Sequence, residues 1–421
     1  MKNYLTSESV CCGHPDKLCD HIADSILDAC LATDAYSRVA CEVMATKGRI
    51  IVAGEITSRG TPNVRKTVRS ALAQCGYDPK DYAISVYLHT QSPDIASGVD
   101  RALEIRDADG SQEELGAGDQ GTVYGYATDE TPTGIPLPLE LAHRICMGLD
   151  ECRMSATILG ICSDGKAQVS VEYADGKPKR VAAIIVSVQH EPDKNVEWLK
   201  GEILRKVLYP AFEDFPFDSH TRILINPSSR FVEGGPAADT GLTGRKIMVD
   251  TYGGLALHGG GAFSGKDATK VDRSGAYMAR MAAKHIVVAE LAERCEVAIS
   301  YAIGKAEPVA VNVHTFATGT HNDEKLAEAV RRVFSLKPRD IIDQLGLRNP
   351  IYDLTSCYGH FGNSLFPWEQ VSERHVQALR DELENHDLKE THHENPEDET
   401  VGSESGCIQS AQSPQTRRSR V

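Results

Sequence analysis

The spacing of hydrophobic residues predicts an amphipathic helix close to the start of the chain. Between residues 16 and 31, Leu18, Ile22 and Ile26 recur at every fourth position, with acidic residues between them. That period places the apolar side chains on one face of a helix. Pro15 suits the first helical turn, because its missing N–H would have no partner there.

The same reasoning predicts a repeating order of elements along the rest of the chain. The further predicted helices are 63–75, 137–152, 196–209, 274–294 and 323–334. The predicted strands are 38–46, 49–57, 82–89, 122–127, 156–162, 167–173, 181–189, 221–225, 295–303 and 309–316. A turn at 163–165 is expected to join two of them. A helix, two strands and a second helix recur three times, roughly 120–140 residues apart, which indicates three related α+β domains.

Two segments lack this periodicity. Residues 91–115 contain Gly, Asp and Ser without a repeat, and a loop of that length is often a functional lid. Beyond about residue 385 the chain is polar, first acidic and then basic, so a disordered tail is expected. The expected organisation is three domains at 1–100, 101–232 and 233–384, followed by the tail 385–421.

Composition narrows the classes of function. The 421 residues carry a formal net charge of −15, which argues against general nucleic-acid binding because that needs a basic face. The sequence has no long apolar run that would cross a membrane, and its first ten residues lack the apolar core of a signal peptide, so a cytoplasmic protein is expected. The 12 cysteines include no CxxC pair and are expected to be free thiols.

Two glycine-rich motifs imitate nucleotide-binding patterns. Residues 116–121 fit GxGxxG, but a strand rather than a helix is expected after them, which disfavours a dinucleotide site. Residues 260–266 fit GxxxxGK, but Asp267 stands where a phosphate-binding loop needs Ser or Thr. The glycines can still present backbone N–H groups to an anion. The cationic residues around them are Arg245, Lys246, Lys266, Lys270 and Arg273.

Longer motifs resemble those of the S-adenosylmethionine synthetases. The matching motifs are SESV (7–10), GHPDK (13–17), GAGDQGTVYGYATDE (116–130), GLTGRK (241–246), GGGAFSGKD (259–267), KVDRS (270–274) and YGHFG (358–362). The resemblance implies three similar α+β domains around a pseudo-threefold axis. It also implies a homodimer or homotetramer with active sites between subunits, with ATP and L-methionine as substrates.

The implied reaction is attack of the methionine sulfur on C5′ of ATP. Tripolyphosphate leaves whole and is then hydrolysed to pyrophosphate and phosphate. A thioether is a neutral nucleophile and needs no base, whereas the leaving group gains negative charge as its bond breaks. Such a site should be rich in fixed positive charge and poor in general bases.

Site residues follow from the resemblance, position by position. The implied catalytic residues are His14, Lys17, Lys166, Arg245, Lys246 and Lys266, and all of these except Lys17 are expected to contact the triphosphate. The rest of ATP is expected to contact Asp164, Arg230, Phe231, Asp239 and Ala262. The residues expected to hold methionine are Glu55, Gln91, Asp119, Asp239 and Lys270. Asp16 and Asp272 are the implied ligands of two Mg²⁺ per site, and Glu42 is the implied ligand of potassium.

Alternatives and departures stay open. Taken singly, Lys166 could be a surface charge and Phe231 a core ring. Another ATP-dependent enzyme would release ADP, and a catalytically silent metabolite-binding relative would lack the motif charges, which are present here. Cys11 and Cys12 replace the Ser and Glu usual before GHPDK, and the segment 91–115, which would gate the site, is longer than in compact members.

Overall fold

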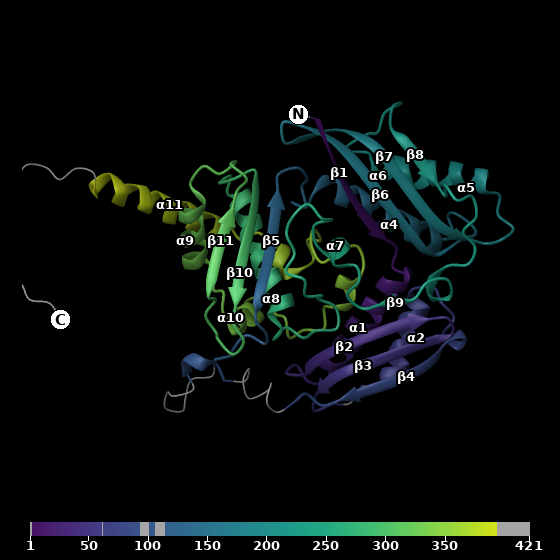
Figure 1. Cartoon of the computed structure of the whole chain (residues 1–421), viewed down its shortest axis with the longest axis horizontal. Coiled ribbons are helices and arrows are strands. Elements are labelled where there is room, and N and C mark those ends of the chain that lie inside the picture. Colours follow the sequence, from purple (N-terminus) through teal and green to yellow (C-terminus); the bar gives the residue numbers. More distant parts are fainter. Residues whose placement is uncertain (1, 61, 93–100, 106–113, 394–421) are drawn as a thin grey trace, which may run out of the picture. The chain divides into compact units, whose positions relative to one another are not determined.

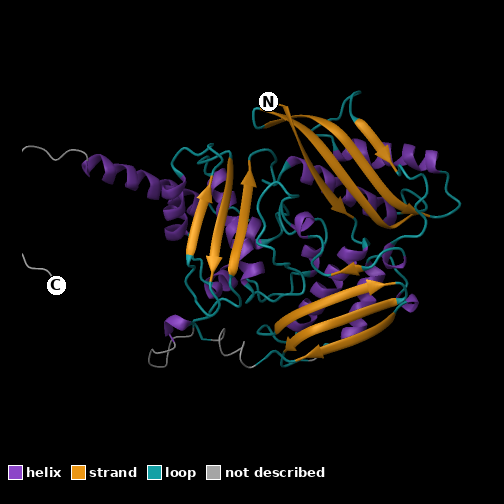
Figure 2. Ribbon diagram, viewed as in Figure 1, coloured by secondary structure: helices purple, strands orange, loops and turns teal. Residues whose placement is uncertain are grey.

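The computed structural model describes residues 2–60, 62–92, 101–105 and 114–393. Its large compact unit, Met1–Leu383, contains three β-sheets around one centre (Figure 2). The first has the order β4 (Ala83–His89), β3 (Arg49–Thr57), β2 (Arg38–Thr46) and β9 (Gly241–Leu242). The second has the order β1 (Lys2–Val10), β6 (Ile161–Ala174), β7 (Lys177–His190) and β8 (Arg222–Ile225). The third has the order β11 (Ala310–His314), β10 (Arg294–Tyr301) and β5 (Gly121–Thr128).

Helices pack on one face of each sheet (Figure 1). The described α-helices are α1 (Pro15–Leu31), α2 (Val64–Gln74), α4 (Leu137–Met154), α5 (Val196–Ile203), α6 (Tyr209–Ala211), α7 (Ile247–Asp250), α8 (Val271–Val288), α9 (Asp323–Val333), α10 (Pro338–Gln344) and α11 (Glu373–His393). Helix α1 contacts β2, α4 contacts β1 and β6, and α8 contacts β5 and β10. We call each sheet with its helices a unit. One hydrophobic core lies between α4 and the second sheet, and a larger core joins the first and third units.

The three units are built alike, and the expected α+β fold is confirmed. In the first two units an antiparallel pair of strands is followed by a helix and then by a parallel edge strand, β4 beside β3 and β8 beside β7. Each sheet also takes a strand from a distant part of the sequence: β9 pairs with β2, β1 with β6, and β5 with β10. The units are therefore interleaved along the chain.

The predicted strand 156–162 and turn 163–165 are wrong. A single strand, β6, runs through the turn-like residues, because its ladder with β7 includes Ile161 before them and Gly165 at their end, and its pairing with β1 begins directly afterwards at Lys166. The ladder with β7 shifts register between Ile161 and Gly165, which accommodates Asp164-Gly165 inside the strand. Helix α8 also differs from the predicted 274–294: it begins at Val271 and ends at Val288, and Arg294 opens β10.

The N-terminal strand β1 has a weak hydrophobic pattern for a clear reason. Its inward positions Ser7 and Ser9 are buried although both are polar. The hydroxyl of Ser9 lies 2.8 Å from Nδ1 of His143 on helix α4, which satisfies both groups inside the core. Because these inward residues are serines, alternation of polar and apolar side chains does not reveal the strand.

The buried His143 leads to a prediction about acid stability. Burial, and then the charge of Lys17, lower the pKa of His143 to about 3, below the ordinary value of a histidine. The unfolded chain therefore binds the extra proton first as the pH falls, and the free energy of unfolding should drop by up to about 1.4 kcal/mol per pH unit below pH ~6.5. Urea unfolding at several pH values should show a shallower decline for His143→Asn.

The matched control for this experiment is His220→Asn, since His220 is exposed. That variant should keep the slope of the unmodified protein. If His143→Asn and the unmodified protein gave parallel curves between pH 6.5 and 4, burial of a neutral His143 would not be a source of acid sensitivity.

One pair of cysteines departs from the expected free thiols. Cys12 and Cys357 form a disulfide with their Cα atoms 5.4 Å apart, across 345 positions of sequence. The other described cysteines are free, as expected, and most are buried in the cores. The sequence predicts free thiols because it has no CxxC pair. Spacing along the sequence does not report contacts between the two ends of a chain.

Two of the predicted segments, the loop and the tail, fall largely on residues that the structure does not describe. Most of the segment 91–115 lies outside the described residues, as does the expected tail from residue 394 onward. The polar residues before it continue helix α11 to His393. Among the helices that the structure describes, none is both long and apolar enough to cross a membrane.

Candidate active site

Helix α1 carries a row of four aspartates that fastens distant loops to it. Asp16, Asp20, Asp24 and Asp28 recur at every fourth position, and the first three are buried. Each accepts at least one backbone N–H from a loop far along the chain. In the same order, the donors are Leu242 at 3.0 Å, Gly244 at 2.9 Å, Gly265 at 2.9 Å, and Tyr352 and Asp353 at 3.1 and 2.8 Å. This aspartate row fixes the motifs 241–246 and 259–267 beside helix α1.

His14 lies at the turn between β1 and α1, where it caps the helix. Its Nδ1 accepts the backbone N–H of Asp16 at 3.2 Å. Burial, and then the positive charges of Lys246, Lys166 and Lys17, lower the pKa of His14 to about 3. The ring is therefore neutral near pH 7, and the proton assigned to Nε2 makes that atom a hydrogen-bond donor.

Asp16 collects positive charge at the same helix end. The amino group of Lys246 lies 2.5 Å from its Oδ2, and a guanidinium nitrogen of Arg245 lies 3.8 Å from its Oδ1. Burial opposes ionisation, but the hydrogen bonds from Lys246 and from the backbone of Leu242 hold the pKa of Asp16 below its usual range. The carboxylate is therefore ionised, with two cations beside it.

Strand β6 brings two further predicted residues to this end of helix α1. Lys166 pairs in register with Val10, the last residue of β1, and its amino group lies 2.5 Å from a carboxylate oxygen of Glu8. Asp164 accepts the backbone N–H of Gly235 at 2.8 Å. Burial raises the pKa of Asp164 to about 6. Lys166 is nearly half exposed and could turn to an anionic ligand.

The glycine-rich motif and the start of α8 form a second charged group. Lys266 lies 2.6 Å from Asp272, and Lys270 forms an ion pair with the buried Asp267. Gly261 lies against Asp272, because a Cβ on Gly261 would stand 2.2 Å from the carboxyl carbon of Asp272. The missing side chain of Gly261 thus leaves room for the Asp272 carboxylate.

Strand β2 places Glu42 beside this second group. Two residues before it on the same strand, Ala40 forms an isolated antiparallel β-bridge with Lys266. Burial raises the pKa of Glu42, Lys266 acts in the opposite direction, and Glu55 on β3 raises it further. Glu42, Glu55 and Lys266 therefore lie within electrostatic reach of one another on this sheet.

The charged group around Asp16 and the charged group around Asp272 lie on loops that touch. Thr243 donates its backbone N–H to Val43 of β2 at 3.0 Å. A Cβ on Gly244 would stand 2.6 Å from the Cβ of Ala262, so only glycine allows this approach. The loop with Arg245 and Lys246 and the glycine-rich loop before Lys266 are therefore neighbours in space.

The other predicted contacts are more dispersed. Asp119 is exposed, and the adjacent Gly118 packs on the backbone of Thr269 and Lys270. Glu55 lies 3.3 Å from His89, and the backbone N–H of Gln91 donates to Thr57 at the end of β3. Arg230 and Asp239 are exposed. Phe231 is half-buried, and its backbone pairs with His190.

Lys17 differs from the other predicted cations. Its amino group lies 2.5 Å from Asp250 and 3.0 Å from Asp20, and the side chain is fully buried. Burial opposes the charge, but the two carboxylates raise the pKa of Lys17. Burial likewise raises the pKa of Asp20, to about 7. The Lys17 amino group is thus enclosed by Asp20 and Asp250 and ties helix α1 to the end of α7.

The implied metals can be tested against these donors. Among the described residues, no cluster of three or more His, Cys, Asp or Glu forms a cage for a metal ion. Mg²⁺ on phosphates needs only one or two protein carboxylates plus water and phosphate oxygens, so ionised Asp16 and the half-buried Asp272 fit it. Both carboxylates already accept an ammonium group. Glu42 offers potassium one hard oxygen ligand.

Several supporting residues were missed in the sequence. Glu8, Asp20, Asp24, Asp250 and Asp267 each pair with a cation of the site or hold one of its loops. For the aspartate row a signal existed, since acids at every fourth position share one helix face.

Comparison with known proteins identifies the family of the chain. Models of the N-terminal, central and C-terminal domains of S-adenosylmethionine synthetase match residues 2–95, 114–231 and 233–370. The chain is 50% identical over 391 residues to the S-adenosylmethionine synthase of Finegoldia magna, covering 90% of this chain and 99% of that one. It is 52% identical over 388 residues to that of Thermus thermophilus, covering 90% and 98%.

A third relative extends the same picture. The S-adenosylmethionine synthase of Staphylococcus epidermidis is 48% identical over 396 residues, covering 91% of this chain and 98% of that one. The matches run through all three units and include every motif with a charged site residue. The chain therefore belongs to the S-adenosylmethionine synthetase family.

Proposed function

We propose that this protein makes S-adenosylmethionine from ATP and L-methionine. The methionine sulfur attacks C5′ of ATP, tripolyphosphate leaves, and the same site then hydrolyses it to pyrophosphate and phosphate. One observation carries the proposal: Lys246 and Lys266 lie on touching loops, and Arg245 and Lys166 lie beside the same helix end. That concentration of positive charge matches a leaving group whose charge grows in the transition state.

His14 supports this reaction as a neutral donor. Burial and the neighbouring lysines lower its pKa, so the ring of the free protein is neutral near pH 7. A hydrogen bond from Nε2 to the departing oxygen would strengthen as that oxygen gains charge, which favours the transition state over the bound substrate. The sulfur nucleophile needs no proton removed, so no general base is assigned.

The remaining assignments rest on the resemblance of the motifs to those of the family. We assign ATP to the surroundings of Asp164, Arg230, Phe231, Asp239 and Ala262. Methionine goes to Glu55, Gln91, Asp119, Asp239 and Lys270, whose acid and lysine ends suit a zwitterion. Mg²⁺ bound by Asp16 and Asp272 would supply positive charge to the phosphates, and Glu42 would hold potassium. Lys17 is a positioning residue.

We further propose that the active form is a homodimer or homotetramer with sites between subunits. Tyr87 on β4 and Tyr4 on β1 are 67% and 58% exposed, on strands whose sheets are covered by helices on one face. Large exposed aromatic side chains on open sheet faces favour association. Light scattering of the purified chain at several concentrations tests this, and a monomer at all concentrations would contradict it.

Product analysis tests the function itself. In the presence of magnesium and potassium, the purified protein should convert ATP and methionine into a sulfonium product with one adenosyl group per methionine consumed, together with pyrophosphate and phosphate. Omitting methionine should stop adenosyl transfer. Release of ADP, or ATP consumption that is indifferent to methionine, would favour another ATP-dependent enzyme. Binding of both substrates without turnover would favour a silent relative.

The close approach of Gly261 gives a sharper prediction. A methyl group in Gly261→Ala would meet the Asp272 carboxylate and displace it by several tenths of an ångström or more. Misplacement of about 1 Å at a site can cost about 100-fold in rate. Turnover should therefore fall by about 10- to 100-fold, with a higher magnesium requirement, in steady-state assays at varied magnesium.

Gly201→Ala is the matched control for this substitution. Gly201 lies in helix α5, and a Cβ there would meet no atom within 4 Å. It should keep full activity. Normal kinetics and magnesium dependence in Gly261→Ala would remove Asp272 from the proposed metal site.

A further inference from the structure

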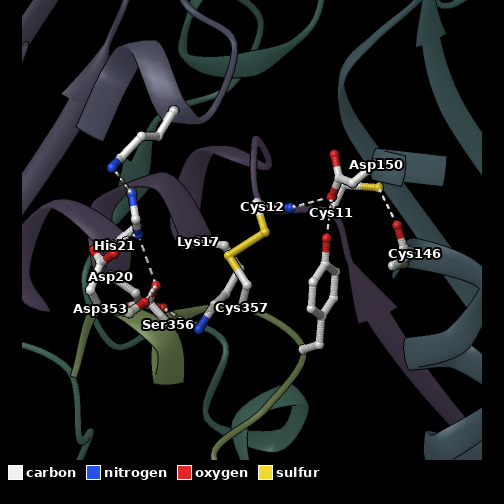
Figure 3. The surroundings of a disulfide bond; sticks show 12 residues. Cys11, Cys12, Lys17, Asp20, His21, Cys146, Asp150, Asp353, Ser356 and Cys357 are labelled. Carbon is white, nitrogen blue, oxygen red and sulfur yellow. Dashed lines mark hydrogen bonds and ion pairs between the residues drawn. A yellow bond between two sulfur atoms is a disulfide. The ribbon is translucent and has the colours of Figure 1, made fainter. Parts of the chain in front are cut away.

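The disulfide between Cys12 and Cys357 lies between the turn that carries His14 and a cavity lined by both cysteines. Cys12 precedes Gly13 and His14 in the turn that leads into helix α1, and Cys357 precedes Tyr358. Figure 3 shows the bond between these two segments, with Lys17 and His21 of α1 close by. A covalent tie therefore reaches within two residues of His14.

A cavity of about 710 Å³ lies beside the disulfide. Cys12 and Cys357 line it and are only partly buried, and its other lining residues include His21, Cys75, Met147 and Phe361. A cavity of this size holds a small molecule. None of the residues assigned to ATP, methionine or metal lines it. A thiol could thus reach the bond without entering the active site.

A hydrogen-bonded clamp holds the two segments together independently of the bond. Oδ2 of Asp150 on α4 accepts the backbone N–H of Cys12 at 2.9 Å and the hydroxyl of Tyr358 at 2.8 Å (Figure 3). Arg153 lies 3.3 Å from the other oxygen of the same carboxylate. These contacts remain when the sulfurs part, so the thiols of the reduced protein stay close enough to join again.

Further contacts couple the position of Cys12 to that of His14 in the turn before helix α1. The backbone N–H of His14 donates to Cys11, and Tyr77 donates its hydroxyl to the carbonyl of Gly13 at 2.5 Å. A Cβ on Gly13 would stand 2.4 Å from Ser163, so the turn is tightly packed. A change at Cys12 is therefore transmitted to His14 through a short and rigid path.

We propose that Cys12 and Cys357 form a reversible thiol–disulfide exchange site, at which small thiol compounds entering the cavity set the order of the His14 turn. The thiolate of the small compound attacks one sulfur, the S–S bond breaks, and the other cysteine leaves as a thiolate. A second molecule of thiol then releases the mixed disulfide. In sum, two small thiols become one small disulfide, and the protein gains two S–H groups.

The test compares oxidised and reduced full-length protein. One sample is treated with oxidised glutathione and the other with dithiothreitol, and both are freed of reagent and alkylated. Peptide mass spectrometry should find 12 and 357 cross-linked in the first sample and alkylated in the second. Reduction should lower the melting temperature by several degrees and turnover by about two- to tenfold, since the turn is loosened by less than the ångström that costs about 100-fold.

Variants separate the site from general thiol effects. Cys12→Ser and Cys357→Ser should each abolish the difference between the two samples. Cys162→Ser, which removes a free and partly buried thiol outside the cavity, should preserve it. Tyr358→Phe retains both cysteines but removes half of the clamp, so reoxidation by oxidised glutathione should slow several-fold at unchanged overall fold.

Three outcomes would overturn the proposal. One is complete alkylation of both cysteines after oxidation. Another is a cross-link that no reductant opens in the folded protein. The third is identical melting and turnover of the two samples. The cross-link and the melting temperature are read without any assay of S-adenosylmethionine, so they stand even if the proposed activity fails.

Discussion

Lys266→Met lowers the rate of S-adenosylmethionine formation by about 10²- to 10³-fold at saturating substrates, the loss typical when one transition-state donor is removed. Lys266 pairs with Asp272 at 2.6 Å and adjoins the loop that bears Lys246, so its charge is fixed where the triphosphate is proposed to lie. Its loss should affect kcat more than binding, because the charge of the leaving group grows only as the bond breaks. Initial rates across a range of ATP and methionine concentrations measure this.

A matched lysine gives the control. Lys200→Met removes a lysine on helix α5 that pairs with Glu197 away from the site, and it should leave kcat unchanged. If Lys266→Met kept more than about a tenth of the activity, Lys266 would not be a transition-state contact. An increase in KM at constant kcat would make it a ground-state binding residue.

Arg273→Met should destabilise the protein by about 3–5 kcal/mol, as removal of one partner of a buried ion pair does. The guanidinium is fully buried, donates to both oxygens of Asp24 at 2.8 and 3.0 Å, and also reaches the backbone carbonyls of Phe263 and Lys266. The substitution leaves the Asp24 carboxylate buried with too few donors. Denaturant unfolding measures the loss.

The comparison for this loss is Arg332→Met. Arg332 is half exposed and pairs with Glu328 and Glu382 at the surface, where water replaces a lost partner, so little change is expected. Equal effects of the two substitutions would show that burial is not what makes the Arg273 pair matter. The same buried pair also holds the glycine-rich loop, so weak activity should accompany the loss of stability.

Much of the fold could be predicted from hydrophobic period alone. The strands 38–46 and 49–57 and the helix at 16–31 agree with the structure to within a residue, because their apolar residues recur with the period of each element. Strand β6 could not be found in the same way. Its Asp164-Gly165 has the chemistry of a turn, but the ladder with β7 continues from Ile161 to Gly165, and Gly165 also accepts the backbone N–H of Cys11, so the chain stays extended there.

The site was predicted in part, for a related reason. Motifs that resemble a known family identified the cations, and the structure brings Lys246 and Lys266 onto touching loops. Resemblance could not tell that Lys17 is enclosed by Asp20 and Asp250, since burial depends on residues more than 200 positions away. The Cys12–Cys357 bond could not be predicted either, because the two cysteines are 345 positions apart in the sequence.

The pairing of β1 with β6 has a consequence for how the chain is made. A ribosome releases Lys2–Val10 first, but the partner strand is complete only after Ala174 has emerged. Until then the open edge of β1 lacks its ladder and invites wrong partners. A fragment cut at the first domain boundary would keep that strand without a mate, so we expect the three units to be acquired or lost together rather than to fold one after another.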